Sequence, residues 1–127
     1  MFRCYSMIIV TLYGILFAFQ CFGSISGALL ASRFSSSLND FYKSAQYTSY
    51  MIEKGNKQPD IYNDALLYSV AAGEFEQAFS LAGEMEKSGL KSPALALTLI
   101  SEKLKKKEFD TAIQLISKYE ANLPEVL

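Results

Sequence analysis

The residues of this chain that could do acid–base chemistry are two pairs of glutamates, Glu74 with Glu76 and Glu84 with Glu86. General acid–base catalysis needs carboxyl groups that share a pocket and have shifted pKa values. Residues two positions apart on a helix do not face each other, so neither pair forms such a set. The surrounding sequence implies no apolar pocket that would raise a carboxyl pKa. We therefore expect no acid–base role for these glutamates.

Nucleophilic and metal chemistry also lack their usual residues. The chain has no histidine, which removes Ser–His and Cys–His nucleophile pairs and the commonest metal ligand. Its two cysteines, Cys4 and Cys21, are too few for a cysteine-rich zinc site. We therefore expect no catalytic residue, no metal site, no cofactor and no enzymatic activity.

The charge of the chain argues against a nucleic-acid partner. The 127 residues carry a formal net charge of −1, whereas a general nucleic-acid binder needs a clear basic excess. The one basic cluster consists of four lysines: Lys103, Lys105, Lys106 and Lys107. It could meet anionic lipid or an acidic partner. We favour a solvated helix end, because acidic residues flank the cluster on both sides.

The N-terminal lead, residues 1–23, is apolar and small-residue rich. Arg3 is its single charged residue, residues 7–22 form its apolar centre, and Cys21 and Gly23 have the spacing that a signal peptidase recognises. A cleaved secretory signal peptide is one interpretation. The other is an uncleaved anchor, since residues 5–24 are long enough to cross a bilayer. Both interpretations remain open at this point.

A 34-residue period in the rest of the chain indicates its secondary-structure elements. Two series of residues keep this spacing, one aromatic and one small: Phe41, Phe75 and Phe109; Ser44, Ala78 and Ala112. Pro59 and Pro93 have the same separation. A self-similar period of 34 residues with paired helices is typical of a helical solenoid.

The predicted fold class is all-α. We expect an α-solenoid of about three helix-turn-helix repeats after an N-terminal hydrophobic helix. The repeat domain covers residues 24–127, and its units fall at about residues 26–58, 59–92 and 93–126. Apolar residues at three- and four-residue steps predict six helices: residues 26–38, 41–54, 60–72, 75–88, 94–106 and 109–121.

Small residues and turns set how the predicted helices pack. Gly73 permits the left-handed conformation that turns the chain between two helices. Ala78 and Ala82 allow the helices of the second unit to approach closely, and Tyr62 packs on the facing helix.

The last predicted helix carries an apolar stripe of Ile113, Ile116 and Tyr119 with no following unit to cover it. Solenoids need a polar outer face at their ends, and an uncovered stripe tends to find a partner surface. We therefore expect this C-terminal open face to self-associate or to bind another chain. The third possibility is that the chain is a truncated piece of a longer repeat protein.

These features resemble the tetratricopeptide repeat (TPR) family. Its motif has a glycine at the inner turn, an aromatic residue two positions later and an alanine three beyond. The second unit matches all three places; the third has Lys107 in the glycine place, and the first has Asn39 and Ser44 as substitutes. Tyr62 alone holds the early aromatic place. The resemblance covers about residues 26–124.

The resemblance implies a non-enzymatic scaffold that binds a peptide or helix in a concave groove. The first helix of each unit would line that groove with these residues: Arg33, Ser37, Asn63, Leu67, Val70, Leu97, Ser101 and Lys105. Some members clamp a peptide's terminal carboxylate with basic residues. Of the equivalent places here, Arg33 could help and Asp64 would repel, so we expect no such clamp.

The lead and the following small residues resemble the start of exported bacterial members of this family. That resemblance implies export across, or anchoring in, the bacterial inner membrane, with the repeat domain in the periplasm. The alternative function is a small membrane-anchored subunit whose N-terminal helix assembles with other membrane proteins.

Overall fold

The structure, a computed structural model, describes residues 24–120 and contains six α-helices and no strand within that range. The helices are α2 (Ile25–Ser37), α3 (Phe41–Glu53), α4 (Pro59–Ala71), α5 (Phe75–Lys87), α6 (Pro93–Lys105) and α7 (Phe109–Tyr119). The all-helical prediction is therefore confirmed for this range. None of these helices is long and apolar enough to cross a bilayer. The predicted lead, residues 1–23, lies outside the described residues.

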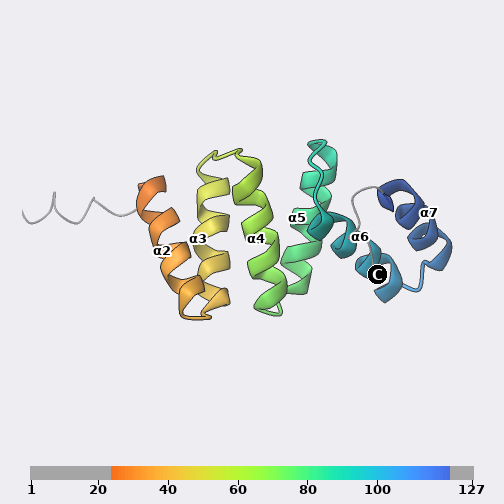
Figure 1. Cartoon of the computed structure of the whole chain (residues 1–127), viewed down its shortest axis with the longest axis horizontal. Helices are drawn as coiled ribbons and strands as arrows, with labels where there is room; N and C mark the ends of the chain where they lie inside the picture. Colours follow the sequence, from red (N-terminus) through yellow and green to blue (C-terminus); the bar gives the residue numbers. More distant parts are fainter. Residues whose placement is uncertain (1–23, 121–127) are drawn as a thin grey trace, which may run out of the picture.

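The helices stand in one row, from α2 at one end to α7 at the other (Figure 1). Each helix packs on the next along the chain, and α4 also contacts α6. The helices follow the predicted 34-residue period: α2, α4 and α6 begin 34 residues apart, and so do α3, α5 and α7. This arrangement is consistent with an α-solenoid. We call α2, α4 and α6 the first helices, and α3, α5 and α7 the second helices.

Local sequence explains where several helices begin. Pro59 and Pro93 are the first residues of α4 and α6, where the missing N–H of proline leaves no helical bond unmade. The side chains of Ser24, Asp40 and Ser92 cap α2, α3 and α6 by accepting a hydrogen bond from a backbone N–H three residues on. Both helices begin one residue before the predicted starts at residues 60 and 94.

The turn inside each unit repeats the same backbone conformation. Asn39, Gly73 and Lys107 have positive φ values of 59°, 79° and 60°. The N–H after each of them bonds to the carbonyl five residues back, at 2.9 Å in all three turns. This bond ends the first helix with a left-handed residue and satisfies a carbonyl that the helix leaves free. The glycine prediction for this place is confirmed at Gly73, and the substitutes adopt the same conformation.

Small residues bring the paired helices together. Ser44, Ala78 and Ala82 are fully buried, and Ala112 is 2% exposed. Ser44 also donates its hydroxyl proton to the carbonyl of Ser32 on α2, at 3.1 Å. Phe41 stacks on Tyr68 of α4 with ring centroids 6.3 Å apart. Tyr62 packs against the larger core cluster, which consists of buried residues of α4 to α7: Ala65, Leu66, Ala78, Leu81, Ala82, Met85, Leu95, Ala96, Leu99 and Tyr119.

Two of the predicted packing residues are more exposed than expected. Phe75 and Phe109 are 51% and 59% exposed, although both occupy the place of Phe41 in their units. The residue equivalent to Tyr68 in the next unit is Glu102, so Phe75 has no aromatic ring to stack on. Phe109 begins the last described helix, and no described helix follows to cover it.

Tyr119 corrects the predicted C-terminal open face. Ile113 and Ile116 are 62% and 44% exposed, as expected, but Tyr119 is only 4% exposed. Its place in the repeat is that of Met51 and Met85, which are buried against the first helices. Its ring joins the larger core cluster, and its hydroxyl group bonds to Glu86 of α5 at 3.2 Å.

Candidate functional site

The predicted groove residues all lie on first helices and form a largely exposed set. Leu67, Val70 and Leu97 are 46%, 39% and 49% exposed. Arg33, Ser37, Ser101 and Lys105 are also exposed, and Asn63 is half-buried. We call these eight residues the first-helix face. Exposed apolar side chains that alternate with polar groups are what a surface needs to bind an amphipathic segment.

Asn63 has an unusual environment within this face. Its side-chain oxygen is buried and accepts no hydrogen bond from any group of residues 24–120. It lines a pocket of about 250 Å³ between α4 and the start of α6, together with Pro59, Lys91 and Pro93. A buried acceptor without a donor is destabilising, because it has lost its hydrogen bonds to water. Asn63 therefore lines the pocket as a residue, while its oxygen stays buried.

Arg33 is engaged with the neighbouring first helix. Its guanidinium group lies 3.8 Å from the carboxylate of Asp64 on α4. Burial raises the pKa of Asp64, the charge of Arg33 opposes this shift, and Asp60 adds to it. Because Asp64 already competes for Arg33, a ligand carboxylate gains little there.

The side chain of Lys105 on the first-helix face is engaged by residues of α5. Its ammonium group bonds to Glu76 of α5 at 2.7 Å and lies 5.2 Å from the ring centroid of Phe79. The hydrogen bond from Lys105 lowers the pKa of Glu76. At the other end of the row, the hydroxyl group of Ser37 donates to the carbonyl of Phe34. The exposed apolar residues Leu67, Val70 and Leu97 are therefore the main candidates for binding on this face.

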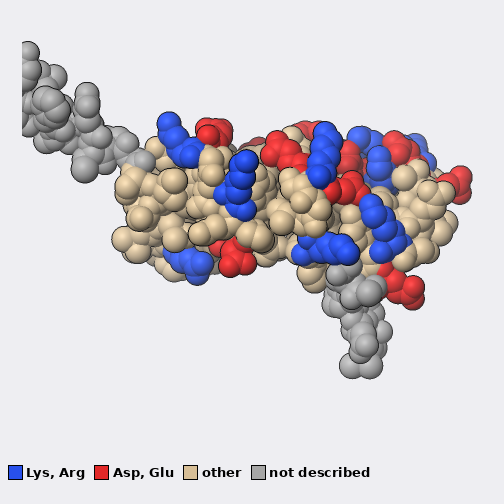
Figure 2. All heavy atoms as spheres, turned by 90° about the horizontal axis from the view of Figure 1, so that it is seen from above, with Lys and Arg blue, Asp and Glu red and all other residues tan. Residues whose placement is uncertain are grey.

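Other charged groups of α5 to α7 form pairs along the row. Lys103 contacts Glu108 at 3.2 Å, Lys106 bonds to Glu102, and Lys118 bonds to Glu86 at 2.8 Å. Figure 2 shows that charged side chains gather over the α5 to α7 half, whereas the α2 end is mostly uncharged. Much of the lysine cluster is thus matched by nearby carboxylates, as the interpretation of a solvated helix end expects.

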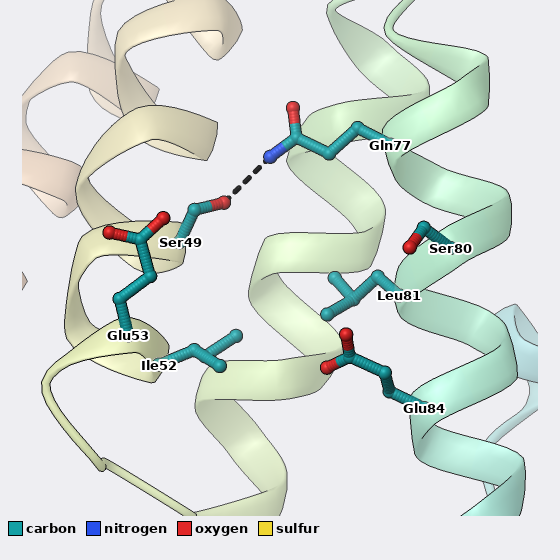
Figure 3. Close-up of a pocket in the computed structure, with 7 residues that line it drawn as sticks. All are labelled: Ser49, Ile52, Glu53, Gln77, Ser80, Leu81 and Glu84. Carbon is teal, nitrogen blue, oxygen red and sulfur yellow. Dashed lines mark hydrogen bonds between the residues drawn. The ribbon is translucent and has the colours of Figure 1, made fainter.

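A second pocket lies between the second helices α3 and α5 and was not predicted. It has a volume of about 170 Å³ and is lined by Ser49, Ile52, Glu53, Gln77, Ser80, Leu81 and Glu84. Gln77 spans it by donating to the hydroxyl group of Ser49 at 2.7 Å (Figure 3). Figure 3 also shows Glu53 and Glu84 on opposite sides of the opening. No group of acidic or sulfur ligands suited to a metal ion occurs within residues 24–120.

Sequence reasoning missed this pocket for a geometric reason. Its walls come from two units, and their separation depends on how one unit is rotated against the next. The sequence pattern singled out Glu84 only as the partner of Glu86, two positions along the same helix. The 34-residue register would have placed Ser49 and Gln77 on neighbouring second helices, which is the one signal that the sequence offers.

No protein-family model, curated protein sequence or solved structure matches this chain. The resemblance to tetratricopeptide repeats therefore rests on the residues and on the geometry described above.

Proposed function

We propose that this chain is a non-enzymatic interaction scaffold of the tetratricopeptide type, which binds a peptide or helix of another protein on its first-helix face. We also propose that its six helices form an α-solenoid of three such repeats. Its partner is a segment with apolar side chains, matched to Leu67 and Leu97.

The observation that carries this proposal is the recurrence of helix starts and left-handed turns at 34 residues. Equivalent helices face the same way in a repeat of this kind, so single exposed residues from α2, α4 and α6 add up to one extended surface. A scaffold needs nothing more than such a surface. Of the four glutamates that were weighed for acid–base chemistry, Glu76 and Glu86 are in ion pairs, with Lys105 and Lys118.

The N-terminal lead also supports a proposal about where the protein is located. An apolar segment before a repeat domain supports export across, or anchoring in, a bacterial inner membrane, with the repeats in the periplasm. Mass spectrometry of the chain purified from membranes and from the periplasm tests this. A mature N-terminus near Ser24 indicates a cleaved signal, whereas an intact Met1 in the membrane fraction indicates an anchor.

Site-specific photocross-linking tests the binding surface. A photoreactive amino acid replaces Leu97 in one variant and Ser80, an exposed residue of the second helix α5, in the control. We expect a discrete protein adduct from position 97 and none from position 80. Leu97→Asp should then weaken binding of the captured protein about tenfold or more, because an apolar contact is replaced by a charge, while Ser80→Asp leaves binding unchanged.

The result that would contradict the proposal is equal adduct formation at both positions, or none at either. Capture at position 80 alone would move the binding surface to the second helices. Each of these outcomes leaves the helical architecture untouched, so the test addresses the surface and not the fold.

A further inference from the structure

The last second helix, α7, exposes residues whose repeat equivalents are buried. Ile116 is equivalent to Thr48 and Ala82, which are fully buried, yet Ile116 is 44% exposed. Ile113 is equivalent to Ala45, which is 2% exposed, yet Ile113 is 62% exposed. Ala82 packs in one cluster with Leu95 and Leu99 of the first helix that follows it, whereas Phe79, the other equivalent of Ile113, is half-buried. In α7 the place of that following helix is open among the described residues.

The first helix of the row, α2, has the complementary property. Leu30 is 74% exposed, whereas its equivalent in α6, Thr98, is 7% exposed. Gly27 is exposed and Ala31 is half-buried, although the residues equivalent to them in α4 and α6 are buried. The face of α2 that corresponds to the contact with a preceding unit is therefore open as well.

An internal contact shows how the two open faces fit. Phe41 stacks on Tyr68 across the contact between α3 and α4. The residue that is equivalent to Phe41 in α7 is Phe109, and the residue that is equivalent to Tyr68 in α2 is Phe34. Phe109 and Phe34 are 59% and 65% exposed. The two halves of one aromatic pair thus stand at opposite ends of the row.

Side-chain size is matched in the same way. Inside the chain, small Ala82 shares the larger core cluster with large Leu95 and Leu99 of the following unit. At the ends the sizes are exchanged. The large residue is Ile116 on α7, and the small residues are Gly27 and Ala31 on α2, in the places of Leu95 and Leu99. A contact between α7 and α2 would therefore set one large side chain against two small ones, which lets the two helices approach closely.

We propose that copies of this chain associate head to tail, with α7 of one copy packing on α2 of the next in the geometry that α3 and α4 already have. The occupant of each open face is thus a second copy. This contact is heterologous, so it can repeat from copy to copy. A symmetric contact between two α7 helices would oppose Ile116 to Ile116 and lose the match in size. The proposal does not depend on binding at the first-helix face.

Thiol cross-linking of the full chain in mild detergent tests the proposal. Cys4→Ser and Cys21→Ser remove the native thiols, and Phe34→Cys and Phe109→Cys are made in chains with different tags. With a short bifunctional thiol reagent we expect dimers carrying both tags when the two variants are mixed, and none from either variant alone. Phe75→Cys mixed with Phe34→Cys is the matched control, because Phe75 is 51% exposed but its helix is already followed by α6.

Dimers of Phe109→Cys alone would overturn the proposal in favour of a symmetric contact. No dimer in the mixture would also overturn it and leave the open faces to residues 1–23 or to another protein. Light scattering keeps the test valid if a cysteine variant fails to fold. The parent chain should associate with increasing concentration, Ile116→Lys should weaken this association at least tenfold with unchanged helix content, and Leu97→Lys should leave it intact. A parent chain that stays monomeric would contradict the proposal.

Discussion

At the scale of single residues, the turn within each unit is the most constrained position. The third unit places Lys107 in the left-handed conformation, with φ at 60°, where the second unit has Gly73. A side chain with a Cβ atom is strained there by about 1–2 kcal/mol, and glycine is not. Asn39, which tolerates this conformation better than most residues, serves in the first unit.

We therefore predict that Lys107→Gly raises the free energy of unfolding by about 1 kcal/mol, since relief of strain outweighs the added freedom of the unfolded chain. Chemical denaturation followed by circular dichroism measures the change. The control is Lys106→Gly, one residue earlier, where φ is −80° and no strain is present. That variant should be neutral or less stable than the parent. Equal effects of the two changes would mean that the turn is not strained at Lys107.

A second residue-scale feature is the carboxylate of Glu86, which joins α5 to α7. It accepts hydrogen bonds from Lys118 at 2.8 Å and from Tyr119 at 3.2 Å. The bond from Lys118 lowers the pKa of Glu86 below its ordinary value of 4.5, with partial burial opposing and the Tyr119 hydroxyl adding to the shift. A lowered carboxyl pKa contributes stability above the unfolded value that is lost as the pH falls through the folded value.

We predict that Glu86→Gln is less stable than the parent at pH 7 and that this difference shrinks below pH 4.5. The reason is that protonation removes the same charge from the parent that the substitution removes from the variant. Urea denaturation of both proteins at a series of pH values measures the difference. A gap that stayed constant down to the acid limit would show that the Lys118 contact does not stabilise the fold.

At the scale of elements, the close approach of paired helices depends on the small series at Ser44, Ala78 and Ala112. All three side chains are at most 2% exposed. We predict that Ala78→Leu lowers the free energy of unfolding by roughly 1–3 kcal/mol through overpacking. Ser80→Leu, on the exposed side of the same helix, should change stability by less than about 0.5 kcal/mol. Coincident melting curves for parent and Ala78→Leu would place Ala78 outside the helix contact.

The helix positions were largely predictable, because the 34-residue period fixes the starts of several helices at once. The aromatic and small series place the second helices, and Pro59 and Pro93 mark the first helices to within a residue. The same register, applied to Met51 and Met85, would have placed Tyr119 in the core. The apolar spacing along α7 instead grouped Tyr119 with Ile113 and Ile116. That spacing does not show whether a side chain faces the preceding helix of its own unit or the helix that would follow.

Contacts between units were not predictable from the sequence. The ion pair of Arg33 with Asp64, the contact of Lys105 with Glu76 and the pocket between α3 and α5 all depend on the rotation between successive helix pairs. A periodic pattern fixes which residues face a neighbour but not how far that neighbour is turned.

At the scale of the whole molecule, equivalent helices lie beside equivalent helices. The first helices α4 and α6 touch directly, and Gln77 of α5 bonds to Ser49 of α3. The row therefore offers two different long surfaces, one from each class of helix. We propose that a protein partner binds the surface of the first helices.

Hydrogen–deuterium exchange of the full chain, alone and with the protein captured at position 97, tests that claim most directly. Exchange reports local opening, which a bound partner suppresses where it docks. We predict slower exchange in α4 and α6 on binding, with the outward side of α3 and α5 unchanged. Protection confined to α3 and α5, or none in the first helices, would show that the partner does not bind the first-helix face.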